Sequence, residues 1–295
     1  MPKLHPLAWL ALAAVLVLLL RMLESRWPQL SWLLFFSLTL SLGFAHGVLD
    51  IVLLRHALPR PRVLAHFSLY GVAVIIVLVA AWRLPALALL VLLLLSVWHF
   101  GQELHPLRLA RLALGGAAVM WPMIVQPIQM QTLLTQAFPQ AAWLMLAWQA
   151  LAWVWLQCLL VAIARHWSAT AVRNRLLLES AGLALMYSLL SPWLAFALYF
   201  SLFHSVAHIR RVWQASFAAG VSWAEQRTGL LLTALLTTAL IATCAWIFVP
   251  QVQWINLMQS AWALPAWVAL VTAVTVPHGL LVGLAWAWLQ TTKRY

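Results

Sequence analysis

Five of the ten histidines in the chain lie inside long apolar runs rather than at their ends. Ionisable groups are costly within a bilayer, so they usually face the protein interior and mark a functional site. Packing would explain one such residue, whereas five on four apolar runs favour a shared role. Imidazole nitrogens bind iron, zinc, copper and nickel, so the pattern predicts a metal centre. The five residues are His46, His99, His204, His208 and His278.

The spacing of four of these histidines places them at a similar depth in the membrane. His204 and His208 are four residues apart, so both project from one face of a helix and can bind one ion. They precede Arg210 by six and two residues, and His46 and His99 each precede an arginine by nine. At about 1.5 Å per residue, these four lie roughly 3–14 Å from a basic boundary. The fifth histidine is expected to lie deeper, because fifteen residues separate it from the basic C-terminus.

A carboxylate lies one helical turn beyond two of the histidines. Asp50 follows His46 by four residues. Glu103 follows His99 at the same spacing, in a chain with only five acidic residues. A carboxylate in this position can orient an imidazole by accepting a hydrogen bond. Direct ligation of the metal, and a salt bridge to a neighbouring arginine, are the alternatives for both residues.

Aromatic side chains crowd the same segments. We expect most of them to pack in the core or at the membrane interface, and a subset to line a slot for a long apolar substrate. The residues expected beside the metal or the substrate are His278, Asp50, Glu103, Trp98, Phe100, Tyr199 and Phe203.

The composition predicts that the chain is solvated by a bilayer. Hydrophobic residues make up 65% of the 295 residues and charged residues only 7%, far too little charge for a soluble surface. Apolar runs of nearly twenty residues recur along the chain. The pattern predicts an all-α, polytopic transmembrane helix bundle with about ten spans, and eight to ten as the range. The expected spans are 6–23, 30–54, 64–82, 85–105, 112–129, 141–164, 176–190, 192–209, 229–249 and 262–289.

The basic residues lie in short loops between the runs, although the formal net charge of +12 alone could suggest nucleic-acid binding. The positive-inside rule explains this distribution, so no nucleic-acid partner is expected. Charged and uncharged connections alternate, which favours an even number of spans with both termini cytoplasmic, in the inner (cell) membrane of a bacterium. The loop with Arg21, Glu24 and Arg26 is the exception, because it would face outward.

No boundary divides the chain, so we expect a single integral-membrane catalytic domain over residues 1–295. The first apolar run is expected to be a retained helix, because no A-x-A cleavage pattern follows it before Arg21. Cys158 and Cys244 lie inside apolar runs and form no CxxC pair, so neither a disulfide framework nor a thiolate metal site is indicated.

Four sequence blocks, in this order, resemble the Brp/Blh family of membrane-bound β-carotene 15,15′-dioxygenases, which supply retinal to rhodopsins in bacteria and archaea. The blocks are HG-x-x-D at His46–Asp50, WHFGQE at Trp98–Glu103, HS-x-x-H at His204–His208, and the pair Pro277–His278. Two positions differ from the family pattern. Ala45 stands where proline is usual, and Leu104 where an acidic residue is usual.

The resemblance implies an all-helical membrane enzyme with a non-haem Fe(II) held by His46, His99, His204 and His208. It implies oxidative cleavage of the central double bond of β-carotene by O₂, giving two retinals, with His278 near the substrate or behind the ligands. The carotenoid would enter from the lipid bilayer, and the retinal could be passed to a rhodopsin. The two departures leave another carotenoid or apocarotenoid open as the substrate.

Two other function classes were weighed against this one. A membrane di-iron desaturase or hydroxylase uses several histidine clusters, whereas this chain has one HxxxH motif. A non-enzymatic haem or metal-binding protein is the second, since transmembrane histidine pairs can ligate haem. A metal transporter would need polar groups across the full membrane depth, and here they gather in one half.

Overall fold

The described part of the chain is helical throughout, apart from short connections. The computed structural model describes residues 6–39, 41, 60–101, 108–139, 141–218, 222–224, 227–228, 231, 235 and 263–292. Its helices are α1 (Pro6–Arg26), α2 (Pro28–Leu38), α4 (Arg60–Arg83), α5 (Pro85–Gly101), α6 (Arg108–Val125), α7 (Pro127–Ala137), α8 (Ala142–Arg165), α9 (Thr170–Leu189), α10 (Pro192–Leu198), the π-helix η2 (Tyr199–Ser205), α11 (Val206–Ala218) and α14 (Ala263–Thr292). The predicted all-α class is confirmed.

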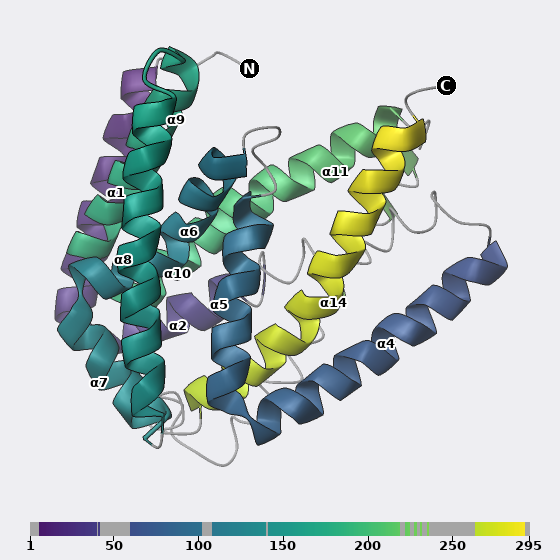
Figure 1. Ribbon diagram of the computed structural model, residues 1–295, viewed down its shortest axis with the longest axis horizontal. Coiled ribbons are helices and arrows are strands. Elements are labelled where there is room, and N and C mark those ends of the chain that lie inside the picture. Colours follow the sequence, from purple (N-terminus) through teal and green to yellow (C-terminus); the bar gives the residue numbers. More distant parts are fainter. Residues whose placement is uncertain are drawn as a thin grey trace.

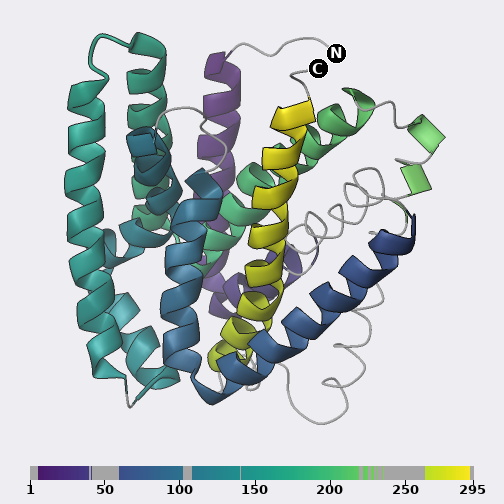
Figure 2. The ribbon, with the colours of Figure 1, turned by 45° about the vertical axis from the view of Figure 1, so that its right-hand side comes forward.

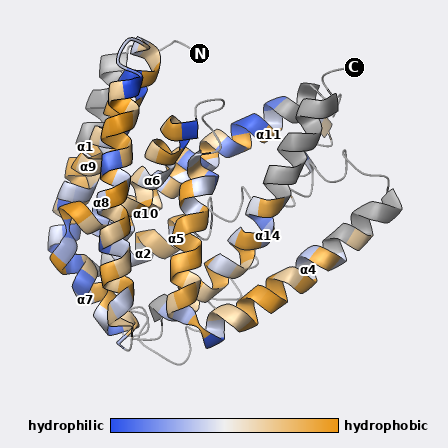
Figure 3. Ribbon diagram, viewed as in Figure 1, coloured by the Kyte–Doolittle hydropathy of each residue, from blue (hydrophilic) through white to orange (hydrophobic). Residues whose placement is uncertain are grey.

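Several of these helices are suited to a bilayer. Three stretches are long and apolar enough to cross it: Arg108–Val125, Ala142–Arg165 and Pro192–Gln214. Shorter apolar helices cover Ser68–Arg83, Pro85–Gly101 and Pro265–Leu280. Hydrophobic residues dominate α4 and α5 in Figure 3, and leucines on outward helix faces are largely exposed, as expected for side chains in contact with lipid. The molecule is a polytopic transmembrane helix bundle.

One predicted span ends differently in the structure. The run predicted at 112–129 breaks at Gln126, where α6 ends and the short helix α7 begins. Pro127 is the first residue of α7, where its missing N–H costs no hydrogen bond and its fixed φ favours a helix start. The predicted span 229–249 lies almost wholly outside the described residues, as does the second half of 30–54.

Helix α6 lies at the centre of the packing. Gly115 lets it approach α5 closely, because a Cβ there would collide with the Val97 carbonyl. A Cβ on Gly116 would collide with the indole of Trp155. Such small residues let helix backbones approach in membranes, where van der Waals packing drives association. The close contact fixes α5, and α5 carries one of the histidines.

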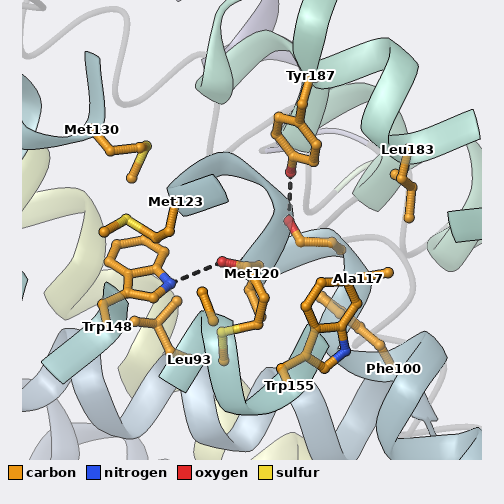
Figure 4. Packing of buried hydrophobic residues seen from close by; sticks show 14 of the residues in the cluster. Leu93, Phe100, Ala117, Met120, Met123, Met130, Trp148, Trp155, Leu183 and Tyr187 are labelled. Carbon is orange, nitrogen blue, oxygen red and sulfur yellow. Dashed lines mark hydrogen bonds between the residues drawn. The ribbon is translucent and has the colours of Figure 1, made fainter. Parts of the chain in front are cut away.

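Hydrogen bonds from large side chains tie the neighbouring helices to the α6 backbone. Trp148 and Trp155 of α8 donate their indole N–H groups to Val119 O at 2.9 Å and Ala113 O at 2.8 Å. The Tyr187 hydroxyl of α9 donates to Ala118 O. Figure 4 shows the bonds of Trp148 and Tyr187 among methionine and leucine side chains. Each bond satisfies a polar group that would otherwise be costly in an apolar interior.

The remaining helices complete the bundle on the other side of α5. Helix α14 packs against both α4 and α5, and α10 packs against α2. The ribbon views show α5 and α14 rising in the same direction from one end of the bundle (Figures 1 and 2). The two helices therefore form a continuous wall along much of the bundle's height.

Candidate metal centre

Four buried histidines meet in the middle of the bundle. They come from separate helical elements: His99 from α5, His204 from η2, His208 from α11 and His278 from α14. Their exposed fractions are only 2–4%. The Nε2 atoms of His99 and His204 lie 3.2 Å apart. Four of the five buried intramembrane histidines expected from the sequence are therefore seen together, and His46 lies outside the described residues.

The four rings surround a common region. The His99 centroid lies 5.0 Å from those of His204 and His278 and 6.2 Å from that of His208. The His208 centroid lies 6.3 Å from that of His204 and 5.6 Å from that of His278. His278 is thus closer to the others than its distance from the C-terminus predicts. The residue count to a basic end gives a depth along one helix, and it does not give the distance to rings on other helices.

A π-helical segment presents His204 to the cluster. The Ser205 hydroxyl donates to Phe200 O at 2.8 Å, five residues earlier. The Ser201 hydroxyl donates to Leu38 O at 2.8 Å, which fixes the same segment to α2. Short π-helical turns are costly and occur frequently at functional sites. The segment leads directly into α11, which carries His208, so both residues of the HxxxH motif point inward as their spacing predicted.

The ring separations are those of imidazoles that bind one ion. A metal–imidazole bond is about 2.1 Å long. Two bound rings then have centroids about 4.6–6.5 Å apart, and their ligating nitrogens about 3.0–3.4 Å apart for adjacent positions. The centroid distances of 5.0, 6.2 and 6.3 Å among His99, His204 and His208, and the Nε2–Nε2 distance of 3.2 Å, fall within these ranges.

The donor atoms themselves do not form a finished site. Within the described ranges, no group of three or more His, Cys, Asp or Glu side chains is arranged to hold a metal ion as it stands. Small rotations of buried rings change nitrogen positions far more than centroid positions. The centroid separations report where the backbone holds each ring. The residues therefore fit an ion with nitrogen ligands.

The aromatic residues expected at the site divide into two groups. Phe100 packs against His204, with centroids 4.5 Å apart, and Tyr199 packs edge-on against Phe100 at 5.6 Å. Trp98 and Phe203, in contrast, are 40% and 59% exposed, so they face the outer surface. Asp50 and Glu103 lie outside the described residues.

An apolar cavity adjoins the histidine cluster. It includes about 1000 Å³ of empty space, counting its open mouth. His99, Phe100 and Phe200 lie at one end. The other lining residues are Phe35, Leu89, Leu92, Leu93, Ser96, Ala118, Val119, Pro122, Met130, Leu133, Leu134, Trp148, Tyr187, Pro192, Trp193, Phe196, Trp267, Val268, Val271 and Thr275.

Most of this lining is apolar, and three of its polar groups are bonded to protein, although the buried Trp267 indole N–H has no hydrogen-bond partner among the described residues. The indole N–H of Trp193 donates to Ser31 Oγ at 3.1 Å. The indole N–H of Trp148 and the hydroxyl of Tyr187 donate to backbone carbonyls of α6. The wall therefore presents hydrocarbon, and it suits a hydrocarbon ligand. The sequence alone does not indicate most of these residues, because apolar side chains on eight separate α-helices and on η2 give no local signal of a shared cavity.

Comparisons with known proteins identify the family of the chain. Residues 9–286 match the β-carotene 15,15′-dioxygenase family. The chain is 25% identical over 260 residues to a β-carotene 15,15′-dioxygenase of uncultured marine bacterium 66A03, covering 83% of this chain and 90% of the relative. No solved structure matches. Since the family match extends over nearly the whole chain and includes all four histidines, the protein belongs to the β-carotene 15,15′-dioxygenase family of oxidoreductases.

Proposed function

We propose that the protein is a carotenoid oxygenase that cleaves the central 15,15′ double bond of β-carotene with O₂, giving two molecules of retinal. The observation that carries this proposal is the contact between a cluster of four buried imidazoles and a cavity walled by hydrocarbon side chains. The name of the marine relative supports the same substrate.

The proposed cofactor is a non-haem Fe(II) ion held by His46, His99, His204 and His208. When bound, it would supply the one-electron chemistry through which O₂ reacts with a carbon–carbon double bond. We assign His278 as a positioning residue. Its ring packs edge-to-face on His99 and His208, with interplanar angles of 76° and 73°, and so limits their rotation. Residues of this kind behind metal ligands tune affinity.

The cavity would bind the polyene and keep water away from the reacting bond. A C40 hydrocarbon is poorly soluble in water, so it would enter from the lipid phase. His99 is the one histidine in the described lining, and cleavage of a carbon–carbon double bond by O₂ requires no general acid or base. Specificity would then come from the shape and length of the cavity.

We further propose that residues 1–295 form one catalytic domain in the inner membrane of a bacterium, with both termini cytoplasmic, and that the retinal product serves a rhodopsin. The start of α1 and the end of α14 lie at the same end of the bundle (Figures 1 and 2). The connection between α8 and α9, with Arg165 and Arg173, lies there too. This common end supports the expected orientation under the positive-inside rule.

Expression in a bacterium that makes β-carotene tests the proposal. The expected result is loss of colour with formation of retinal. Alanine variants of His99, His204 and His208 should keep the colour. His166, half-buried at the end of α8 and far along the chain from the cluster, provides the matched control, and His166→Ala should bleach the cells like the wild type. Persistent colour with folded wild-type protein in the membrane would reject β-carotene as the substrate.

A further inference from the structure

Two helices that line the cavity, α5 and α14, also carry histidines of the cluster. The residue count along each helix therefore gives the length of the cavity from the histidines to its far end. Along α5 the lining extends from Leu89 to His99, and along α14 from Trp267 to Thr275, one turn before His278. Ten residues separate Leu89 from His99, and eleven separate Trp267 from His278. At about 1.5 Å per residue, the imidazoles lie roughly 15–17 Å from the opposite end of the wall.

Helix α7 lies at that opposite end, where α5 and α14 begin, and packs against α14 (Figure 1). Met130 and Leu134, one helical turn apart, are buried at 3% and 4% and line the cavity. Ile128 on the other face of α7 is 78% exposed. Just before α7, the Gln126 amide donates to the carbonyls of Tyr187 and Leu190 at 2.5 and 2.9 Å. Met130 and Leu134 form the floor of the cavity. The bonds of Gln126 fix this floor to α9.

We propose that α7 acts as a stop, which limits how far one half of the substrate enters the cavity. The terminal ring of a C40 carotenoid would then contact Met130 and Leu134. This rests on the proposed function and specifies how the reacting bond is chosen. One half of such a polyene with its terminal ring is roughly 15 Å long, the length of wall that ten residues of α5 provide. A ring seated on the floor brings the middle bond of the chain to the histidines. The second half then lies toward the open mouth.

The stop explains why cleavage is central without any polar group that recognises the middle of the chain. Each carbon of the broken double bond takes one oxygen atom of O₂, so the carbon count of the products reports where the bond lay. A ring resting on an intact floor gives two twenty-carbon products. A deeper floor lets the substrate slide inward by one double bond, about 2.5 Å, the depth that truncation of a buried methionine leaves. The products then have eighteen and twenty-two carbons.

Enlarging the floor tests the stop. Met130→Ala and Leu134→Ala should convert at least a third of the cleavage to the eighteen- and twenty-two-carbon pair. Gln131→Ala, on the exposed face of α7, should give retinal alone, as the wild type does. If both floor variants give only retinal, even at a reduced rate, the floor does not set the cleavage position and the inference is wrong.

A binding measurement on iron-free protein separates this inference from the proposed function. Trp148, Trp193 and Trp267 line the cavity, so bound all-trans-retinol should quench their fluorescence. Leu134→Trp fills the floor and should weaken retinol binding at least tenfold. Ile128→Trp puts the same side chain on the outer face of α7 and should leave binding unchanged. Equal affinity in both variants would overturn the stop, even if the wild type cleaves β-carotene. A tenfold contrast would support it, even if β-carotene is not the substrate.

Discussion

Replacing His278 distinguishes a metal ligand from a residue that positions ligands. The His278 ring is 2% exposed and packs on His99 and His208 at centroid distances of 5.0 and 5.6 Å. In His278→Ala both neighbours lose an edge-to-face contact and gain rotational freedom. Loss of a residue that orients ligands typically weakens metal affinity about 10–100-fold. We therefore expect His278→Ala to bind Fe(II) with an affinity about 10–100-fold below that of the wild type. His99→Ala should retain no measurable affinity.

A pair of variants that keep a planar ring refines this prediction. His278→Phe keeps a planar ring in the same space without nitrogen atoms, so it should bind iron within about tenfold of the wild type. His99→Phe should lose iron, because there the nitrogen itself is required. The assay is anaerobic titration of purified protein with Fe(II), followed by metal analysis after gel filtration. If His278→Phe loses iron as completely as His99→Phe, His278 is a ligand and its assignment as a positioning residue is refuted.

Three further predictions follow from particular contacts. Ser205→Ala removes the hydroxyl bond to Phe200 O that supports the π-helix, so it should lower stability by about 0.5–1.5 kcal/mol and reduce the iron content; unchanged iron content would show that His204 needs no such support. Gly115→Val forces side-chain atoms into the Val97 carbonyl, so thermal unfolding should show that the free energy of unfolding falls by about 1–3 kcal/mol. An unchanged Tm would contradict the close helix contact. Treatment with an iron chelator should abolish retinal formation and leave retinol binding intact, with activity restored by Fe(II); activity that persists in iron-free protein would refute the metal's role.

The histidines could be predicted from the sequence because membranes make polar residues conspicuous. An imidazole within an apolar run stands out from its surroundings, and the i, i+4 spacing of His204 and His208 survives in the folded chain. The helical class followed from composition for the same reason. Bilayers leave few alternatives to helices, so long apolar runs determine the element type almost alone.

Other features could not be derived because they arise from contacts between distant segments. Met130 and Trp267 line one cavity although 137 positions separate them, and nothing in either local sequence indicates this. The π-helix at Tyr199–Ser205 also has no sequence signature, since the hydroxyl bonds that support it become visible only in the fold. The start of α7 at Pro127, in contrast, has a signal in the sequence, because proline is common at the first position of a helix.

The proposed function depends on imidazoles from separate helices that hold a single iron ion. Metal analysis of purified protein, reconstituted anaerobically with Fe(II), tests this directly. We expect one iron per chain in the wild type and in His166→Ala, and less than a tenth of that in the alanine variants of His99, His204 and His208. Equal iron in all five proteins, or two irons per wild-type chain, would contradict the assignment.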